Sequence, residues 1–253
     1  IIRPTQLDKQ PWLKAVLQKN PGILNDFFWP DGHIRVTGRE YNGLLESACY
    51  QRGEMSCTSC HSMHKSDPDD QLARGMRGNQ ACLQCHDEMV SNLTRHTHHA
   101  VDSVGSNCTN CHMPHTSYGL LQAIRGHTIE TPDVATTLKT GRPNACNLCH
   151  LDKTLDWTAR QLAKRTGQVK LTVPEEHRTT AASVLWLLKG DAGQRALAAW
   201  HMGWTPALSA SGSGWQSPLL AELLDDPYSA VRYMAHKALT EQPGFDGFEY
   251  DFG

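Results

Sequence analysis

The sequence predicts a mainly α-helical protein in which a loop-rich region precedes a helical tail. All nine cysteines lie between Cys49 and Cys149, in a stretch rich in Asn, Ser, Thr, Gly and Pro. Beyond about residue 155 cysteine is absent, and apolar residues recur at helical spacing. We expect three parts: an irregular arm over residues 1–48, a cysteine- and histidine-rich module over 49–167, and a short α-solenoid tail over 168–253.

The N-terminal arm shows no clear hydrophobic periodicity. Asn20-Pro21-Gly22 and Trp29-Pro30-Asp31-Gly32 are turn signals, so we expect irregular structure with one short helix over about residues 11–19. His33 directly follows the second turn. A surface histidine is the ordinary interpretation of that position, and a ligand role is the open alternative.

The cysteines of the middle region follow one repeated pattern. Eight of the nine belong to four C-x-x-C-H motifs, which is the attachment signature of haem c. Two thiols three positions apart reach the two vinyl groups of one porphyrin, and the adjacent histidine ligates the iron from the proximal side. The sequence therefore predicts four haem c groups, held by Cys57, Cys60 and His61, by Cys82, Cys85 and His86, by Cys108, Cys111 and His112, and by Cys146, Cys149 and His150.

Zinc and disulfides are the two other uses of such cysteines. Paired cysteines can hold tetrahedral zinc, and a secreted chain can bridge eight thiols. Neither use requires a histidine directly after the second cysteine, yet all four copies have one. The ninth cysteine, Cys49, lies outside the pattern, and we expect a buried free thiol there.

The first 150 residues hold more histidines than the four motifs use. The surplus comprises His33, His64, His96, His98, His99, His115 and His127, which favours histidine on both faces of each iron. His64 follows His61 by three residues and so lies on the proximal side of its own haem; we expect it to bind a neighbouring iron. Met63 and Met113 are the alternative axial ligands.

The stretch from Tyr41 to about Gly167 resembles the multihaem cytochromes of the doubled C-x-x-C-H type, which are related to the tetrahaem cytochromes of nitrifiers. It is most similar to a branch in which that module is fused to helical repeats. The resemblance implies that His64, His96, His99 and His127 are the distal ligands, with His115 in reserve. It rests on Tyr50-Gln-Arg-Gly53, Gly78-Asn-Gln-Ala-Cys82, His96-Thr-His-His99, Gly105, Cys108-Thr-Asn-Cys111-His112-Met113-Pro114, Arg125-Gly-His127, Pro143-Asn-Ala-Cys146, Asp152-Lys153 and Trp157.

The tail has the pattern of short paired helices. We expect Asp156 to cap a helix that closes at Gly167, and further helices over about 180–189, from Asp191 through Trp200, and from Ser217-Pro218. Val231, Met234, Ala235 and Ala238 then share one helix face. Asp191 and Asp226 repeat at 35 residues, and the stretch from Leu223 to Arg232 resembles a HEAT repeat. Two such units are too few to stand alone, so we expect the tail to pack on the haem module.

These patterns predict electron transfer through bis-histidine haems. The formal net charge of −2 gives no indication of a nucleic-acid partner, and no apolar run has the roughly 18 residues of a membrane span. We expect partner redox proteins, or other copies of the chain, to dock at the terminal haems. Haem c is attached outside the cytoplasmic membrane, so we expect a bacterial periplasmic or cell-surface protein whose signal peptide has been removed.

Two other functions remain open at this point. Related multihaem proteins reduce nitrite or oxidise hydroxylamine at a haem with an open coordination position, which the surplus of histidines disfavours here. The other possibility is a self-assembling haem filament in which a neighbouring subunit donates a distal ligand such as His33. The absence of further motifs in residues 1–48 is consistent with a shorter member of the family or with a missing N-terminal part.

Overall fold

A computed structural model describes residues 11–66, 70–167, 169 and 171–252. It confirms the mainly α-helical fold class, because the β structure of these residues is one small two-stranded sheet. Strand β1 (Ser117–Gly119) pairs antiparallel with β2 (Gln122–Ile124), with Ser117 opposite Ile124. Among the described residues, no helix has the length and apolar character that crossing a membrane requires.

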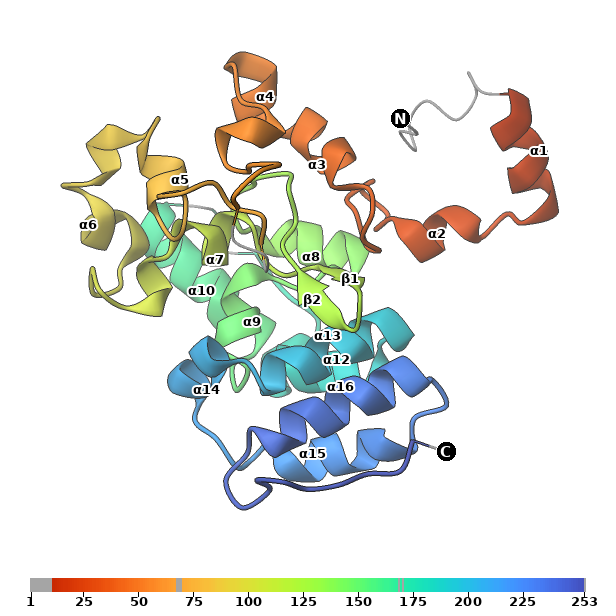
Figure 1. Ribbon diagram of the computed structural model, residues 1–253. Coiled ribbons are helices and arrows are strands. Elements are labelled where there is room, and N and C mark those ends of the chain that lie inside the picture. The colour runs from red at the N-terminus through yellow and green to blue at the C-terminus, as the bar shows by residue number, and fades with distance from the viewer. Residues whose placement is uncertain (1–10, 67–69, 168, 170, 253) are drawn as a thin grey trace.

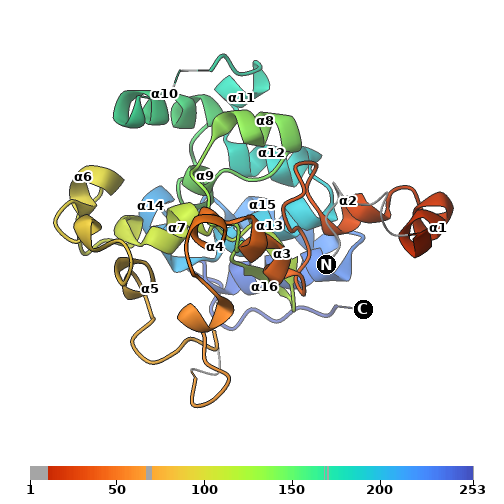
Figure 2. The ribbon, with the colours of Figure 1, turned by 90° about the horizontal axis from the view of Figure 1, so that it is seen from above.

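The N-terminal segment begins with helix α1 (Pro11–Lys19), where the turn signals predict it, followed by α2 (Ile23–Phe27). Both helices project from one side of the body (Figures 1 and 2). The chain then enters the body, where Trp29 is buried and its indole Nε1 donates to the Thr116 carbonyl at 3.2 Å. The second half of the expected arm is therefore anchored on the middle region.

The middle region consists of short helices joined by long loops. Only α8 and α3 reach seven residues, a length that is unstable in isolation. Side-chain caps start three of the helices: Ser47 accepts from the Tyr50 amide, Asp133 from the amides of Ala135 and Thr136, and Asn144 from that of Cys146. The helices are α3 (Glu40–Glu46), α4 (Ala48–Arg52), α5 (Gln80–Leu83), α6 (Leu93–Thr97), α7 (Cys108–His112), α8 (Val134–Thr140) and α9 (Ala145–Cys149), with 3₁₀ turns at Cys57–Ser59, Asp87–Met89 and Val104–Ser106.

Longer helices occur from residue 155 onwards: α10, at the end of the 49–167 module, has 12 residues, and α13 and α16 of the tail have 11 and 12. Asp191 and Gln194 form the expected cap of α13, and Gly167 ends α10 in the left-handed conformation with φ 72°. The cap of α10 is Thr154 and not Asp156, which lies in the first turn and pairs with Arg160. The helices are α10 (Leu155–Thr166), α11 (Glu176–Thr179), α12 (Ala182–Lys189), α13 (Ala192–Met202), α14 (Thr205–Ser211), α15 (Ser217–Glu222) and α16 (Ser229–Thr240), with a 3₁₀ turn at Leu223–Asp225.

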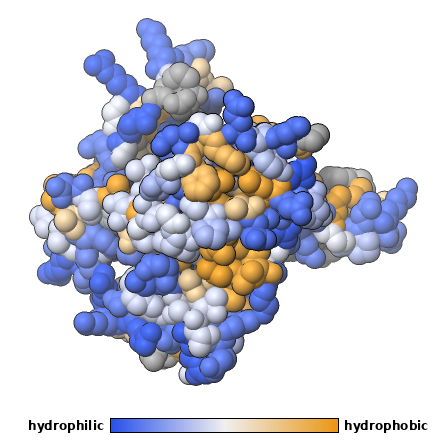
Figure 3. All heavy atoms as spheres, turned by 90° about the horizontal axis from the view of Figure 1, so that it is seen from below, coloured by the Kyte–Doolittle hydropathy of each residue, from blue (hydrophilic) through white to orange (hydrophobic). Residues whose placement is uncertain are grey.

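The largest hydrophobic core lies in the tail and extends into the haem module. Helix α13 packs between α12 and α16, and the predicted face of α16 is buried. Leu148 and Leu151, which flank the end of α9, belong to the same core, so the tail is docked on the module as expected. Figure 3 views the tail from below, where apolar side chains gather in the middle of a mainly polar surface. The HEAT interpretation stays a prediction.

Candidate haem-binding histidines

Three histidines of the C-x-x-C-H motifs each face a histidine from elsewhere in the chain. The rings of His61 and His127 face one another with their centres 6.1 Å apart and their planes inclined by 30°. The same arrangement joins motif histidine His112 to His96 at 5.9 Å and 14°, and His150 to His99 at 6.3 Å and 22°. Each pair combines an expected proximal residue with an expected distal residue.

The spacing of these pairs fits one iron between the rings. An iron held by two imidazoles has metal–nitrogen distances of about 2 Å, and each ring centre lies about 1 Å beyond its nitrogen, so the centres stand about 6 Å apart. Direct stacking of two rings would bring them into closer van der Waals contact. The residues therefore fit bis-histidine haem.

The outer nitrogens of several of these rings are hydrogen bonded. Nδ1 of His61, His112, His127 and His99 lies 3.1, 2.8, 3.0 and 2.7 Å from the carbonyl oxygens of Asp70, Glu130, Arg125 and Thr97. A carbonyl accepts only, so Nδ1 carries the proton and the lone pair of Nε2 is free for a metal. A hydrogen bond from the nitrogen that does not bind the metal fixes the orientation of a metal-binding histidine.

Desolvation favours the neutral form of several of the paired imidazoles. It lowers the pKa of the partly buried His127 and His150 and of the more exposed His96, and a neighbouring imidazole lowers each further. Neutral imidazole is the form that ligates iron. Beside one pair, a Cβ atom built on Gly105 would lie 2.4 Å from the Cδ2 atom of His99. This glycine therefore leaves the space that the His99 ring occupies.

The second motif has a different environment. The His86 side chain is 56% exposed, and its Nδ1 lies 3.8 Å from Glu88. Among the described residues, no ring contact pairs His86 with another histidine. His64, an expected distal ligand, is also exposed and takes part in no ring contact within the described ranges. Figures 1 and 2 place α5, which carries Cys82, and α6 at the edge of the molecule opposite α1.

His115, the reserve ligand, and His33, whose ligand role is the open alternative, have other partners. His33 lies between carboxylates, 3.1 Å from Asp31 and 3.2 Å from Glu130. The His115 ring packs against Trp200 and Trp204, with ring centres 4.9 and 5.0 Å apart. Both side chains thus hold segments of the protein together.

Consecutive motifs lie beside one another. The Gln84 amide of the second motif donates to the Ser59 carbonyl of the first at 3.1 Å, and the Asn79 amide donates to the Ser106 carbonyl at 2.9 Å. Asn79 accepts from the Cys108 amide at 2.8 Å. Helix α7 of the third motif contacts α9 of the fourth. The attachment points therefore form a continuous series in chain order.

Arg125 connects two of the paired sites, a role that the sequence did not indicate. Its carbonyl orients His127, and its guanidinium donates to the Thr109 carbonyl and to Asn110 Oδ1, each at 2.8 Å, on helix α7. Burial lowers the pKa of Arg125 to about 10, so its charge is retained at neutral pH. The position of Arg125 two residues before His127 is the feature of the sequence that could have indicated this role.

A family model for the doubled CXXCH motif matches residues 50–91. This match covers the first two motifs of the chain. No curated protein and no solved structure matches the chain. The paired motifs imply covalently bound haem c and suggest a multihaem cytochrome involved in electron transfer. Covalent attachment of haem c in general takes place outside the cytoplasm.

Proposed function

We propose that the protein is an extracytoplasmic electron conduit with four covalently bound bis-histidine haems. The observation that carries this proposal is the set of three histidine pairs, each with the ring separation that one iron requires. An iron with histidine on both faces has no position for a substrate, so its chemistry is electron exchange. The contacts between consecutive motifs support short distances between successive haems.

The proposed coordination follows from the pairs and from elimination. His127, His96 and His99 would be the distal ligands to the irons of His61, His112 and His150. His64 is then the remaining expected distal ligand and would serve the iron of His86. The Gln84–Ser59 hydrogen bond supports this assignment, because it holds the second motif against the first, from which the His64 segment leaves.

Electrons would enter and leave at exposed haem edges. The second motif is the most exposed of the four, since both Cys85 and His86 are exposed. We propose a partner redox protein, or another copy of this chain, as the electron donor or acceptor there. The periplasm or the cell surface of a bacterium is the proposed location.

A multihaem oxidoreductase is the second candidate function. The observation that favours it is the lack of a ring partner for His86 among the described residues. An iron at His86 without a sixth protein ligand would accept nitrite or hydroxylamine. A filament that uses His33 as an intersubunit ligand is less well supported, because the His33 ring lies between two carboxylates of its own chain.

Carbon monoxide distinguishes the conduit from the enzyme. It binds ferrous haem that has an open position, and bis-histidine haem excludes it. We expect the Soret band of the fully reduced protein to remain unchanged under carbon monoxide, and nitrite and hydroxylamine not to be turned over. A Soret shift of the size expected for one haem would favour the oxidoreductase, provided that the His64→Met variant shows the same shift.

A further inference from the structure

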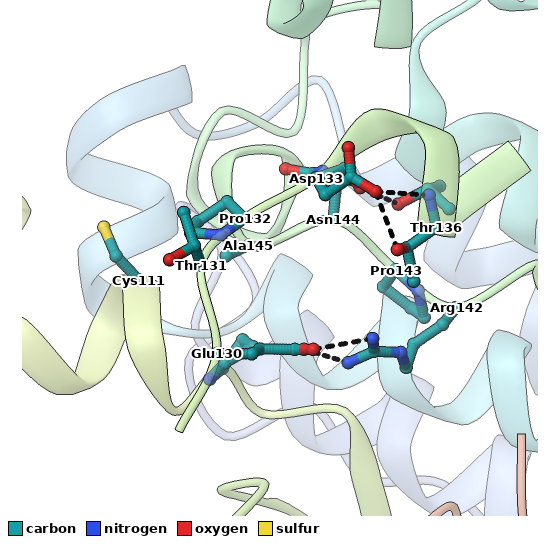
Figure 4. A pocket seen from close by; sticks show the side chains of 12 residues that line it. Cys111, Glu130, Thr131, Pro132, Asp133, Thr136, Arg142, Pro143, Asn144 and Ala145 are labelled. Atoms are coloured by element: carbon teal, nitrogen blue, oxygen red, sulfur yellow. Dashed lines mark hydrogen bonds and ion pairs between the residues drawn. The ribbon is translucent and has the colours of Figure 1, made fainter. Parts of the chain in front are cut away.

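Four charged side chains form a largely buried cluster between the N-terminal segment and the haem module. Arg142, whose side chain is 5% exposed, donates from Nη2 to Glu130 Oε2 at 2.8 Å and lies 3.1 Å from Asp31 Oδ2. A second guanidinium nitrogen pairs with Glu130 Oε1. His33 bridges the same two carboxylates from the other side. Figure 4 shows the two-pronged contact of Arg142 with Glu130.

This cluster is joined directly to a paired histidine. The His112 ring donates from Nδ1 to the Glu130 carbonyl at 2.8 Å, and the Glu130 amide donates to the His112 carbonyl at 2.9 Å. His33, His112, Glu130 and Arg142 also line one small pocket. The same residue, Glu130, thus holds the imidazole with its backbone and the charge cluster with its side chain.

We propose that the Asp31–His33–Glu130–Arg142 cluster is a positioning device for His112 and sets the reduction potential of the haem that His112 and His96 bind. The inference rests on the proposed function, since it requires an iron between those two rings. It assigns a redox role to the N-terminal segment, which supplies Asp31 and His33 and carries no haem motif of its own.

The physical basis is the rigidity and the charge of the cluster. Moving one group out of a buried ion pair is costly, because it leaves an uncompensated charge. The four groups therefore hold one another in place. That fixes the segment whose carbonyl orients His112, and a hydrogen bond from Nδ1 to a carbonyl controls the basicity of the metal-binding imidazole. The charges also lie in a low-dielectric setting, where they act on the iron with little screening.

The contrast with His61 supports the specific role. The His61 Nδ1 also faces a carbonyl, that of Asp70, at 3.1 Å. The Asp70 side chain is 58% exposed, and its contact with Arg77 is 3.9 Å long and lies at the surface. Of these two sites, it is that of His112 in which a buried ionic network stands behind the orienting carbonyl.

The test is a potentiometric titration of the haem-loaded protein, followed by its absorption spectrum. The titration curve is the sum of one redox component for each haem. The component whose potential changes in His96→Met is assigned to this haem. Glu130→Gln removes a negative charge and disfavours ferric iron, so it should raise the potential of that component. Arg142→Gln removes a positive charge and should lower it. The other components should stay in place.

Arg35→Gln is the matched control. It also removes one positive charge from an ion pair, the contact between Arg35 and Asp191, which links the N-terminal segment to the tail and not to a paired histidine. We expect no shift of the component in this variant. If Glu130→Gln or Arg142→Gln yields no haem-loaded protein, Asp31→Asn should raise the potential and Arg142→Lys should preserve it.

The outcomes separate the inference from the proposed function. If His96→Met shifts no component, the ligand assignment fails. If it shifts one, and the charge variants leave that component in place or move it in the same direction, only the positioning role fails. Equal shifts in the reduction potentials of all components in the charge variants would indicate a general loss of structural stability. That result would also contradict the inference.

Discussion

Single side chains decide whether each proposed iron has both of its ligands. His99 keeps its place because Gly105 has no Cβ atom: a methyl group there would overlap the ring. Gly105→Ala should displace His99 and leave one haem with a changed sixth position. We expect a new high-spin ferric signal for about one haem, measured by electron paramagnetic resonance, while haem attachment persists.

Gly22→Ala provides the control for that substitution. Nothing lies within 4 Å of a Cβ atom built on Gly22, and its φ of −85° suits any residue. This variant should retain the wild-type spectrum. An unchanged spectrum in Gly105→Ala as well would contradict the assignment of His99 as a ligand.

His33 should make stability depend on pH. Burial alone would lower its pKa, but the adjacent carboxylates of Asp31 and Glu130 raise the pKa to about 9, against an ordinary value of 6.5. Because the folded-state pKa is the higher one, the stabilisation is complete below about pH 6.5 and is lost as the pH rises through about 9. His33→Gln should therefore cost about 1–3 kcal/mol at pH 6 and little at pH 10.

Denaturant unfolding of the haem-loaded protein, followed by circular dichroism at several pH values, measures this difference. His98→Gln is the control, since the His98 side chain is exposed. Its effect on the free energy of unfolding should be small throughout. A cost of His33→Gln that stays constant from pH 6 to pH 10 would show that His33 is not held in its charged form.

At the scale of elements, the tail is stabilised by ordinary helix packing. Leu220 of α15 is fully buried in the core that also contains Leu151 of the haem module. Leu220→Ala should lower the free energy of unfolding by about 2–5 kcal/mol, because it leaves a cavity in a packed core. The haem spectrum should not change, since α15 bears no haem motif.

Leu188→Ala is the matched control, because Leu188 is 70% exposed and its removal leaves no cavity. We expect a change within about 0.5 kcal/mol in thermal or denaturant unfolding. A Leu220→Ala variant as stable as Leu188→Ala would mean that the tail does not pack as the structure describes.

At the scale of the whole molecule, the chain should carry four haems. Each C-x-x-C-H motif can form two thioethers, which survive denaturation. Mass spectrometry of the denatured protein should therefore give the mass of the polypeptide plus four haem groups. Three or fewer would contradict the interpretation of one of the motifs.

Much of the architecture could be predicted from local sequence. The motif histidines follow from their spacing, and the tail helices follow from periodicity and from capping residues such as Asp191. The partners of the motif histidines are harder to derive, because His127 and His61 are far apart in the chain and meet only through the fold. The burial of His115 against Trp200 depends on how the tail docks, which local patterns do not encode.

The experimental structure of the haem-loaded protein tests the central claim most directly, because it shows the sixth ligand of every iron. We expect His127, His96 and His99 on the irons of His61, His112 and His150, and His64 on the iron of His86. Irons at His61, His112 and His150 that bind other residues, or none, would contradict the conduit assembled from these histidine pairs.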